Sequence, residues 1–308
     1  MMSRANGAAK SPCLVCQAGR NARVIFRLPS CTVVRCALCG FVYLDGERVP
    51  SDERARYEYD HFRGYVCLAG FEVEEIAREQ VESVRSILRR AGSALEEMEP
   101  GLPVLDVGCA RGHFLRRFVQ ETGRRNVTGI DTSPIMTAWG RVSFGLDLRV
   151  GAIEGVDLPA GSFALISMLD VLEHVANPRQ VLARILSLLR PGGWAVLEVP
   201  SEATAFRAMA KLGYRLSAGR LVTPLRTIYH SRHLSYFTRG SLRKLAEDLG
   251  AEAVTIVTKE AHITRFGAGR YALPARIAIR AVSRLDKILG TQAKLLCALR
   301  RPSPENTG

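Results

Sequence analysis

The chain has 308 residues, enough for one large domain or two modest ones, and its 47% hydrophobic and 24% charged content excludes a disordered protein. No apolar run reaches the length of about 18 residues that a membrane span needs, and residues 1–12 lack the apolar core of a signal peptide. The net charge of +13 favours an anionic partner (nucleic acid, a membrane surface or a phosphorylated substrate), although a genomic bias toward arginine explains it equally well.

The N-terminal region, residues 1–45, contains two CxxC pairs separated by short β-like runs. Cys13 and Cys16 form the first pair, and Cys36 and Cys39 form the second. This spacing is typical of a zinc ribbon, in which four thiolates complete a tetrahedron, whereas the alternatives are chance spacing or a redox pair. Because four cysteines leave no open coordination position, we expect the Zn²⁺ to be structural. Eight cysteines in a chain of this length do not indicate a disulfide scaffold, which favours a reducing, cytoplasmic setting.

Residues 46–100 are predicted to form a helical linker or cap. Apolar residues recur at helical spacing through residues 73–98. A stretch rich in proline and glycine, residues 100–103, ends this helix.

Residues 101–308 alternate between strand and helix patterns. Strands are predicted at residues 104–108, 126–131, 148–151, 163–169, 194–200, 251–258 and 293–301, and helices at 113–123, 133–145, 177–193 and 241–250. This alternation indicates an α/β fold, with a parallel sheet covered by helices on both faces. Two inserts interrupt the pattern: residues 201–235 are predicted to be irregular and basic, and residues 260–290 to contain one helix.

The first strand of this domain runs into a glycine turn, VLDVGCARG, that contains Asp106. In an open parallel sheet, ligands bind beyond the carboxyl ends of the strands. A dinucleotide site would show Gly-x-Gly-x-x-Gly, whereas Gly108, Ala110 and Gly112 form Gly-x-Ala-x-Gly. This favours a mononucleotide-like ligand such as S-adenosylmethionine (SAM) over NAD. Asp131, which ends the second strand, is placed to accept hydrogen bonds from both hydroxyls of a ribose.

Four stretches of the chain together resemble the class I SAM-dependent methyltransferases: VLDVGCARG, GID, SFALISMLDVLEHV and LLRPGGWAVLEVPS. The resemblance covers residues 104–258 and the closing strand. It implies a Rossmann-like sheet of seven strands whose last strand is antiparallel. It also implies that the glycine turn cradles the methionine part of SAM and that Asp131 holds the ribose.

The resemblance extends to a fuller set of cofactor contacts. The implied residues are Asp106, Gly108, Cys109, Ala110, Gly112, Asp131, Thr132, Ala152, Ile153, Leu169 and Asp170. In this assignment Ala152 and Ile153 flank the adenine, and Leu169 and Asp170 line the methionine side. The chain departs from the family at Ala110, where the family has a central glycine, and at Ala152, where the family often has an acid that Glu154 would replace.

The segment TIYHSRHLSYFT, residues 227–238, together with the CxxC pairs, resembles C-methyltransferases that act on nucleotide-linked deoxysugars. This resemblance places Tyr229, His233 and His174 at catalytic positions. A histidine suits the removal of a proton near neutral pH. A structural role for either histidine is an equally good interpretation.

The acceptor is less narrowly defined than this resemblance suggests. A Ser-Arg pair stands where the sugar enzymes have a single glutamate, and the LEH signature is closer to methyltransferases with small-molecule, lipid-linked or glycan substrates. We therefore expect a small-molecule or glycan-precursor acceptor. The insert at residues 201–235 carries six basic residues against one acid, which favours an acceptor with phosphate, such as a nucleotide sugar or a lipid-linked intermediate.

Two other functions compete with this hypothesis. An RNA methyltransferase would use the zinc module and the positive charge to bind phosphates. The Asn/Asp-Pro-Pro-aromatic run common in base-amino methyltransferases is absent after the fourth strand, which disfavours nucleic acid. A non-catalytic protein that binds SAM or serves as a zinc scaffold is the third interpretation.

The helix predicted within the second insert, residues 273–289, is basic and amphipathic. Arg276, Arg280, Arg284 and Lys287 recur along one side, beside an apolar stripe. Such a helix lies on an anionic membrane surface or covers a phosphorylated substrate. The favoured interpretation is that the helix packs against its own domain and that its basic side faces solvent. We therefore expect a cytoplasmic protein, with peripheral membrane contact through this helix as the second possibility.

Overall fold

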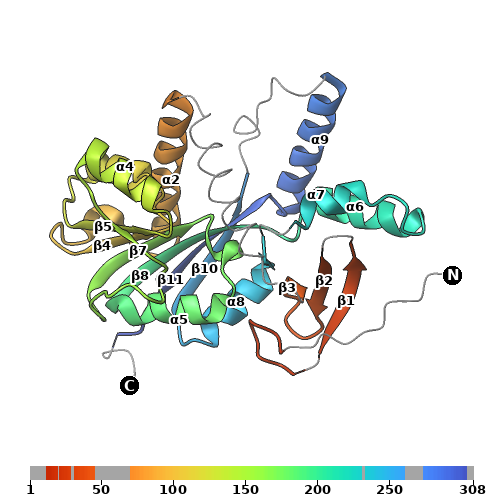
Figure 1. Ribbon diagram of the computed structural model, residues 1–308, viewed down its shortest axis with the longest axis horizontal. Helices are drawn as coiled ribbons and strands as arrows, with labels where there is room; N and C mark the ends of the chain where they lie inside the picture. Colours follow the sequence, from red (N-terminus) through yellow and green to blue (C-terminus); the bar gives the residue numbers. More distant parts are fainter. Residues whose placement is uncertain are drawn as a thin grey trace.

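Figure 1 shows the computed structural model, which describes residues 12–19, 21–28, 31–45, 70–230, 233–260 and 273–303. Its centre is a seven-stranded sheet in the order β10-β11-β8-β7-β4-β5-β6. The strands are β4 (Val104–Val107), β5 (Val127–Asp131), β6 (Asp147–Val150), β7 (Phe163–Leu169), β8 (Leu189–Pro200), β10 (Glu252–Lys259) and β11 (Lys294–Arg300). Strands β4 to β8 pair in parallel, and β11 is antiparallel to both of its neighbours. The predicted sheet with an antiparallel last strand is therefore confirmed.

Helices cover both faces of this sheet. They are α2 (Gly70–Arg90), α3 (His113–Thr122), α4 (Pro134–Phe144), α5 (Pro178–Leu188) and α8 (Arg239–Glu247). In Figure 1, α2 and α4 lie above the sheet and α5 and α8 below it. Alternation along the strands explains the two layers: Val104 packs with α2 and α3, whereas Leu105 packs with α5 and α8.

Two predicted helices end well before their predicted last residue. The long helix of residues 73–98 ends at Arg90 and is followed by a 3₁₀ turn, η1 (Leu95–Glu97), since Gly92 adopts a φ of +79°. The helix predicted for residues 177–193 ends at Leu188, and β8 already begins at Leu189. Gly193 permits this extension, because a Cβ there would lie 2.9 Å from the carbonyl oxygens of Arg190 and Phe163.

A second, antiparallel sheet contains the cysteine pairs. It consists of β1 (Ala22–Arg27), β2 (Thr32–Cys36), β3 (Val42–Asp45) and β9 (Ser235–Tyr236). Strand β9 lies far along the chain, at the end of the first insert, and pairs with β3 through Val42–Tyr236 and Tyr43–Ser235. The small sheet therefore joins the N-terminal module to the segment that contains the predicted catalytic histidine.

The first insert was predicted to be irregular, and this is wrong: it contains α6 (Ala205–Leu216) and α7 (Thr223–Ile228). Thr204 begins α6 by accepting a hydrogen bond of 3.2 Å from the amide of Arg207. The helix expected in the second insert is confirmed as α9 (Leu273–Leu289), although its side chains before Arg280, including that of Arg276, lie outside the described residues, as does Arg232. In the part of the chain that the structure describes, no helix combines the length and hydropathy of a membrane span.

Candidate active site at the carboxyl edge of the sheet

The glycine turn after β4 has the backbone of a ligand cradle. Gly108, Ala110 and Gly112 have φ values of +77°, +47° and +79°. A Cβ on Gly108 would lie 2.3 Å from a methyl carbon of Val171, so a side chain at this position would have to displace Val171. The turn thus leaves bare backbone at the carboxyl end of the first strand of the parallel sheet, which is where such folds bind ligands.

Asp131 connects this turn to the end of β5. Its Oδ2 accepts a 2.8 Å hydrogen bond from the amide of Ala110, and its Oδ1 accepts one of 2.8 Å from the amide of Ser133. Each carboxylate oxygen has further lone pairs. The carboxylate is therefore fixed in orientation and keeps acceptor capacity for the two hydroxyls of a ribose, so this cradle fits SAM.

Two of the predicted cofactor residues support the turn from beneath with buried side chains. Asp106 is 4% exposed, and its Oδ1 accepts a 2.7 Å hydrogen bond from the hydroxyl of Ser167. Burial raises the pKa of Asp106 to about 7, because the charged form loses its hydration. Burial also raises the pKa of the Cys109 thiol well above its usual range. The side chains of Asp106 and Cys109 lie in the interior, so these two residues offer a ligand only their backbone atoms.

The other predicted cofactor residues follow the carboxyl ends of β5, β6 and β7. Thr132 comes directly after Asp131 at the end of β5. The amide of Gly151 donates a 2.9 Å hydrogen bond to the carbonyl of Asp131. This bond brings Ala152 and Ile153, which follow Gly151, to the same edge of the sheet. Leu169 ends β7 and is 8% exposed.

Asp170 adopts a φ of +58°, where few non-glycine residues are found. Its amide donates a 2.9 Å hydrogen bond to the carbonyl of Glu198, and its carboxylate pairs with Lys294. An ion pair and a backbone hydrogen bond thus hold this residue at the boundary of the predicted cofactor site.

A buried ionic cluster behind Asp170 was missed by the sequence reasoning. The Glu198 side chain is fully buried, with Lys294 at 2.6 Å and Lys259 at 3.0 Å. Burial alone would raise the pKa of Glu198, but the two ammonium groups outweigh burial and hold that pKa at about 2. An acid inside the apolar strand WAVLEVP was the one signal for such a cluster, because a buried charge needs partners.

The two predicted histidines lie together beyond β7. His174 ends a 3₁₀ turn, η2 (Leu172–His174), and the amide of Leu234 donates a 2.8 Å hydrogen bond to the carbonyl of Glu173. This contact brings His233 beside His174: the ring centroids are 4.7 Å apart and the planes nearly perpendicular, at 77°. Sequence reasoning predicted both residues but not their contact.

Glu173 completes this cluster. It is 1% exposed, and its Oε2 has no hydrogen-bond partner among the described residues. Burial raises the pKa of Glu173 well above its usual range. Its Oε1 lies 3.9 Å from Nε2 of His174, and one ligand atom each of Glu173, His174 and His233 lie within 4.8 Å of one another. The cluster therefore has the groups for proton transfer and the spacing that could hold a metal ion.

Tyr229, the third residue predicted to be catalytic, is fully buried. Its hydroxyl donates a 2.6 Å hydrogen bond to Oε1 of Glu202, whose other oxygen lies 3.0 Å from Arg207. Lys211 also forms an ion pair with the carboxylate of Glu202. Burial, and then the nearby carboxylate, raise the pKa of Tyr229 well above its usual range. The side chain has no surface to offer an acceptor, and Arg207 and Lys211 are already paired.

The four cysteines of the N-terminal module form a compact cluster. Sγ of Cys13 lies 3.6 Å from that of Cys39, Sγ of Cys16 lies 3.6 Å from that of Cys36, and all four lie within 4.8 Å of one another. Zinc–sulfur bonds of about 2.3 Å in a tetrahedron put sulfurs about 3.8 Å apart, so the cluster fits Zn²⁺. The hydrogen bond between Cys13 and Cys39 lowers the pKa of Cys13 to about 5 and raises that of Cys39, so it favours one thiolate in this pair.

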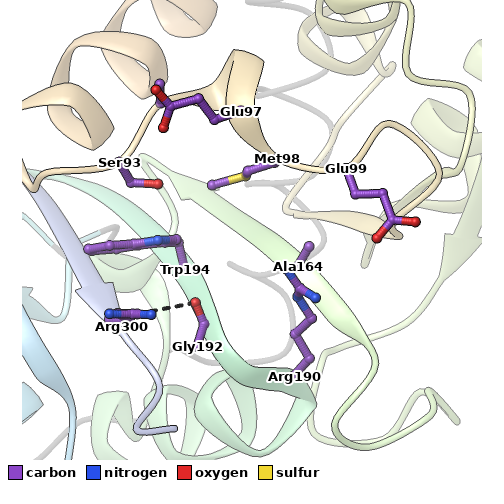
Figure 2. Close-up of a pocket in the computed structure, with 10 residues that line it drawn as sticks. Ser93, Glu97, Met98, Glu99, Ala164, Arg190, Gly192, Trp194 and Arg300 are labelled. Atoms are coloured by element: carbon purple, nitrogen blue, oxygen red, sulfur yellow. Dashed lines mark hydrogen bonds between the residues drawn. The ribbon is translucent and has the colours of Figure 1, made fainter. Parts of the chain in front are cut away.

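A pocket of about 380 Å³ lies at the opposite, amino edge of the parallel strands (Figure 2). Its lining comprises Ser93, Ala94, Glu97, Met98, Glu99, Ala164, Arg190, Gly192, Trp194 and Arg300. Arg300 donates a 3.4 Å hydrogen bond to the carbonyl of Gly192 on its wall. Because ligands of open α/β sheets bind at the carboxyl edge, we assign no part of the active site to this pocket.

The sequence of the central domain was compared with known families. The profile described as "Methyltransferase domain" matches residues 76–256, more than half of the chain. The chain belongs to this family. The resemblance to class I SAM-dependent methyltransferases is thereby confirmed, and this methyltransferase domain contains the glycine turn, Asp131 and the 3₁₀ turn that ends at His174.

Individual relatives match the methyltransferase domain over shorter lengths. The ubiquinone biosynthesis O-methyltransferase of Xanthomonas campestris pv. campestris (strain B100) is 36% identical over 122 residues, which cover 37% of this chain and 49% of that protein. The enzyme of the same name from Xanthomonas axonopodis pv. citri (strain 306) is 34% identical over 123 residues, which cover 38% of this chain and 51% of that protein. The chain thus spans about half the length of the curated relatives it matches.

Two solved structures share the fold with TM-scores of 0.50. A complex of the Haloferax volcanii Trm112 methyltransferase activator with a methyltransferase is 19% identical and covers 74% of this chain and 94% of that chain. A geranyl diphosphate methyltransferase in complex with SAM is 16% identical and covers 72% of this chain and 84% of that chain. At these identities the likeness concerns the methyltransferase fold alone.

Proposed function

We propose that this protein transfers a methyl group from SAM to a small-molecule or glycan-precursor acceptor that carries phosphate, such as a nucleotide sugar or a lipid-linked intermediate. One observation carries the proposal: the glycine turn, Asp131 and His174 lie at or after the carboxyl ends of the neighbouring strands β4, β5 and β7, and His233 packs on His174. A cofactor cradle and groups able to move a proton are therefore available at one edge. The names of the curated relatives support a small-molecule acceptor.

The residues of this chain divide the work of the reaction. SAM, when bound, supplies an activated methyl group, and the protein aligns the nucleophile with it. An oxygen or carbon nucleophile must also lose a proton, which His233 removes while His174 orients the acceptor. Tyr229 is a positioning residue: through Glu202 it fixes the start of the segment that contains His233.

Phosphate recognition is proposed for the first insert. Arg215, Arg220 and Arg226 have exposed side chains, whereas the one acid of the insert, Glu202, is buried and paired. Guanidinium groups bind phosphate oxygens through paired hydrogen bonds. The zinc module supports this site mechanically, since its sheet pairs with β9 and its metal is proposed to be structural. Cys109 and Cys297, which lie outside the zinc module, are buried thiols, in keeping with the proposed cytoplasmic location.

The proposal is tested with methyl-labelled SAM and a panel of nucleoside-diphosphate sugars, polyprenyl-phosphate-linked sugars and neutral phenols. His233→Ala should leave SAM affinity unchanged and reduce turnover of the best acceptor by about 100-fold or more. Arg226→Ala should mainly raise the KM for the acceptor, and Arg149→Ala, an exposed arginine on β6, is its control. Normal turnover by His233→Ala contradicts the base assignment, and exclusive methylation of the neutral phenols contradicts the phosphate-bearing acceptor.

A further inference from the structure

Helix α6 turns an apolar stripe toward solvent. Phe206, Met209, Leu212 and Leu216 are 49%, 50%, 55% and 79% exposed. Their spacing of three, three and four residues places them on one side of the helix. The opposite side packs on the small sheet, where Tyr214 meets Phe26 edge to face at 5.2 Å. Within the described part of the chain, α6 therefore packs through its other side, and the exposed stripe takes no part in that packing.

The last turns of α9, a helix that contacts α6, also expose apolar side chains. Leu285, Ile288 and Leu289 are 42%, 82% and 58% exposed. Between them, the buried carboxylate of Asp286 accepts a 2.7 Å hydrogen bond from the amide of Ala205, the first residue of α6. The end of α9 is thus fixed at the start of α6, as Figure 1 shows. We call these seven exposed side chains and the two helices that present them the α6–α9 surface.

The charge around the α6–α9 surface has one sign. The exposed charged residues of α6, α7, the loop between them and the described side chains of α9 are all basic: Arg215, Arg220, Arg226, Arg280, Arg284 and Lys287. Asp286, the acid of α9, and Glu202, which precedes α6, are 7% and 4% exposed and are bonded internally. A partner for this surface must therefore combine negative charge with an apolar interior.

We infer that the α6–α9 surface binds the face of an anionic phospholipid bilayer. Leucine, isoleucine, methionine and phenylalanine side chains enter the boundary between headgroups and acyl chains, and flanking arginines and lysines pair with lipid phosphates. A second copy of this chain is a poorer occupant, since identical positive surfaces repel each other. Single-stranded nucleic acid offers no counterpart to the aliphatic side chains. Arg215, Arg220 and Arg226 also belong to the proposed phosphate site, so the test of this inference changes apolar side chains alone and is independent of the acceptor.

The full chain is tested by co-sedimentation with vesicles of phosphatidylcholine alone or mixed with phosphatidylglycerol. We expect binding to the mixed vesicles that weakens as salt is raised, because the phosphate contacts are screened. The double variant Leu212→Asp, Ile288→Asp should bind about tenfold or more weakly. Val142→Asp is the matched control, because it places the same charge on a different exposed apolar surface, that of α4, where Val142 is 89% and Ile135 60% exposed, and it should not alter binding.

Three results would overturn the inference. The first is no binding to the mixed vesicles by wild-type protein whose SAM titration shows a folded domain. The second is equal vesicle binding by the double variant and the Val142→Asp control. The third is a concentration-dependent dimer, seen by analytical ultracentrifugation, that the double variant dissociates, because that result assigns the surface to a second copy. SAM affinity, measured in parallel, separates each of these results from a failure of the methyltransferase assignment.

Discussion

The hydroxyl of Tyr229 donates a 2.6 Å hydrogen bond to the buried carboxylate of Glu202, and this bond ties the end of the first insert to the end of β8. Tyr229→Phe removes the donor but keeps the ring, so it should lower the free energy of unfolding by about 1.5–3 kcal/mol, the range for a hydrogen bond to a charged group. Urea unfolding measures this change. Tyr214→Phe is the control, because its ring packs on Phe26 at the same interface. Equal unfolding midpoints for the two variants would show that the Glu202 bond contributes nothing.

SAM affinity should depend on Asp131. Its carboxylate is oriented by the amides of Ala110 and Ser133, each at 2.8 Å, and is placed to accept two ribose hydroxyls. Asp131→Ala should weaken binding by about tenfold or more, as expected when hydrogen bonds to a charged acceptor are lost. Calorimetric titration of SAM measures the effect. Asp147→Ala, a half-exposed aspartate on β6, should bind as the wild type does, and equal affinities for both variants would refute the assignment.

The cysteine cluster should bind one zinc ion per chain. Elemental analysis of the purified protein should detect the metal, and Cys36→Ser should lose it because the tetrahedral set is incomplete. Cys31→Ser should retain the metal, since Cys31 lies outside the cluster and its thiol contacts the carbonyl of Tyr229 at 3.6 Å. A wild-type protein that is fully folded and metal-free rules this site out.

The buried carboxyl of Asp106 should make stability depend on pH. Burial raises its pKa from 3.8 to about 7, so between these values the folded state binds more protons than the unfolded state. This contribution is fully present below the unfolded pKa and is lost as pH rises through about 7. Unfolding midpoints in urea, measured across this range, should fall with pH in the wild type and fall less steeply in Asp106→Asn. Parallel profiles for the two proteins would contradict a raised pKa.

The sequence alone determined the architecture of the central domain and two of its sites. The spacing of apolar residues over a few positions indicates whether a segment is a strand or a helix, so the alternation from residue 104 onward could be predicted from the sequence. The antiparallel closing strand was predicted from the resemblance to the family. The CxxC spacing and the glycine turn are also local, because a knuckle and a left-handed turn each need particular residues at fixed short distances. These features required no knowledge of distant contacts.

Only the tertiary structure decided which distant groups meet. The pairing of β9 with β3, the contact of His174 with His233, and the burial of Tyr229 against Glu202 join segments far apart in the sequence. The same holds for α6, a segment that was predicted to be irregular: its apolar stripe is exposed because its opposite side packs on the small sheet. Periodicity shows that a helix has an apolar side, but burial of that side depends on what the rest of the chain places against it.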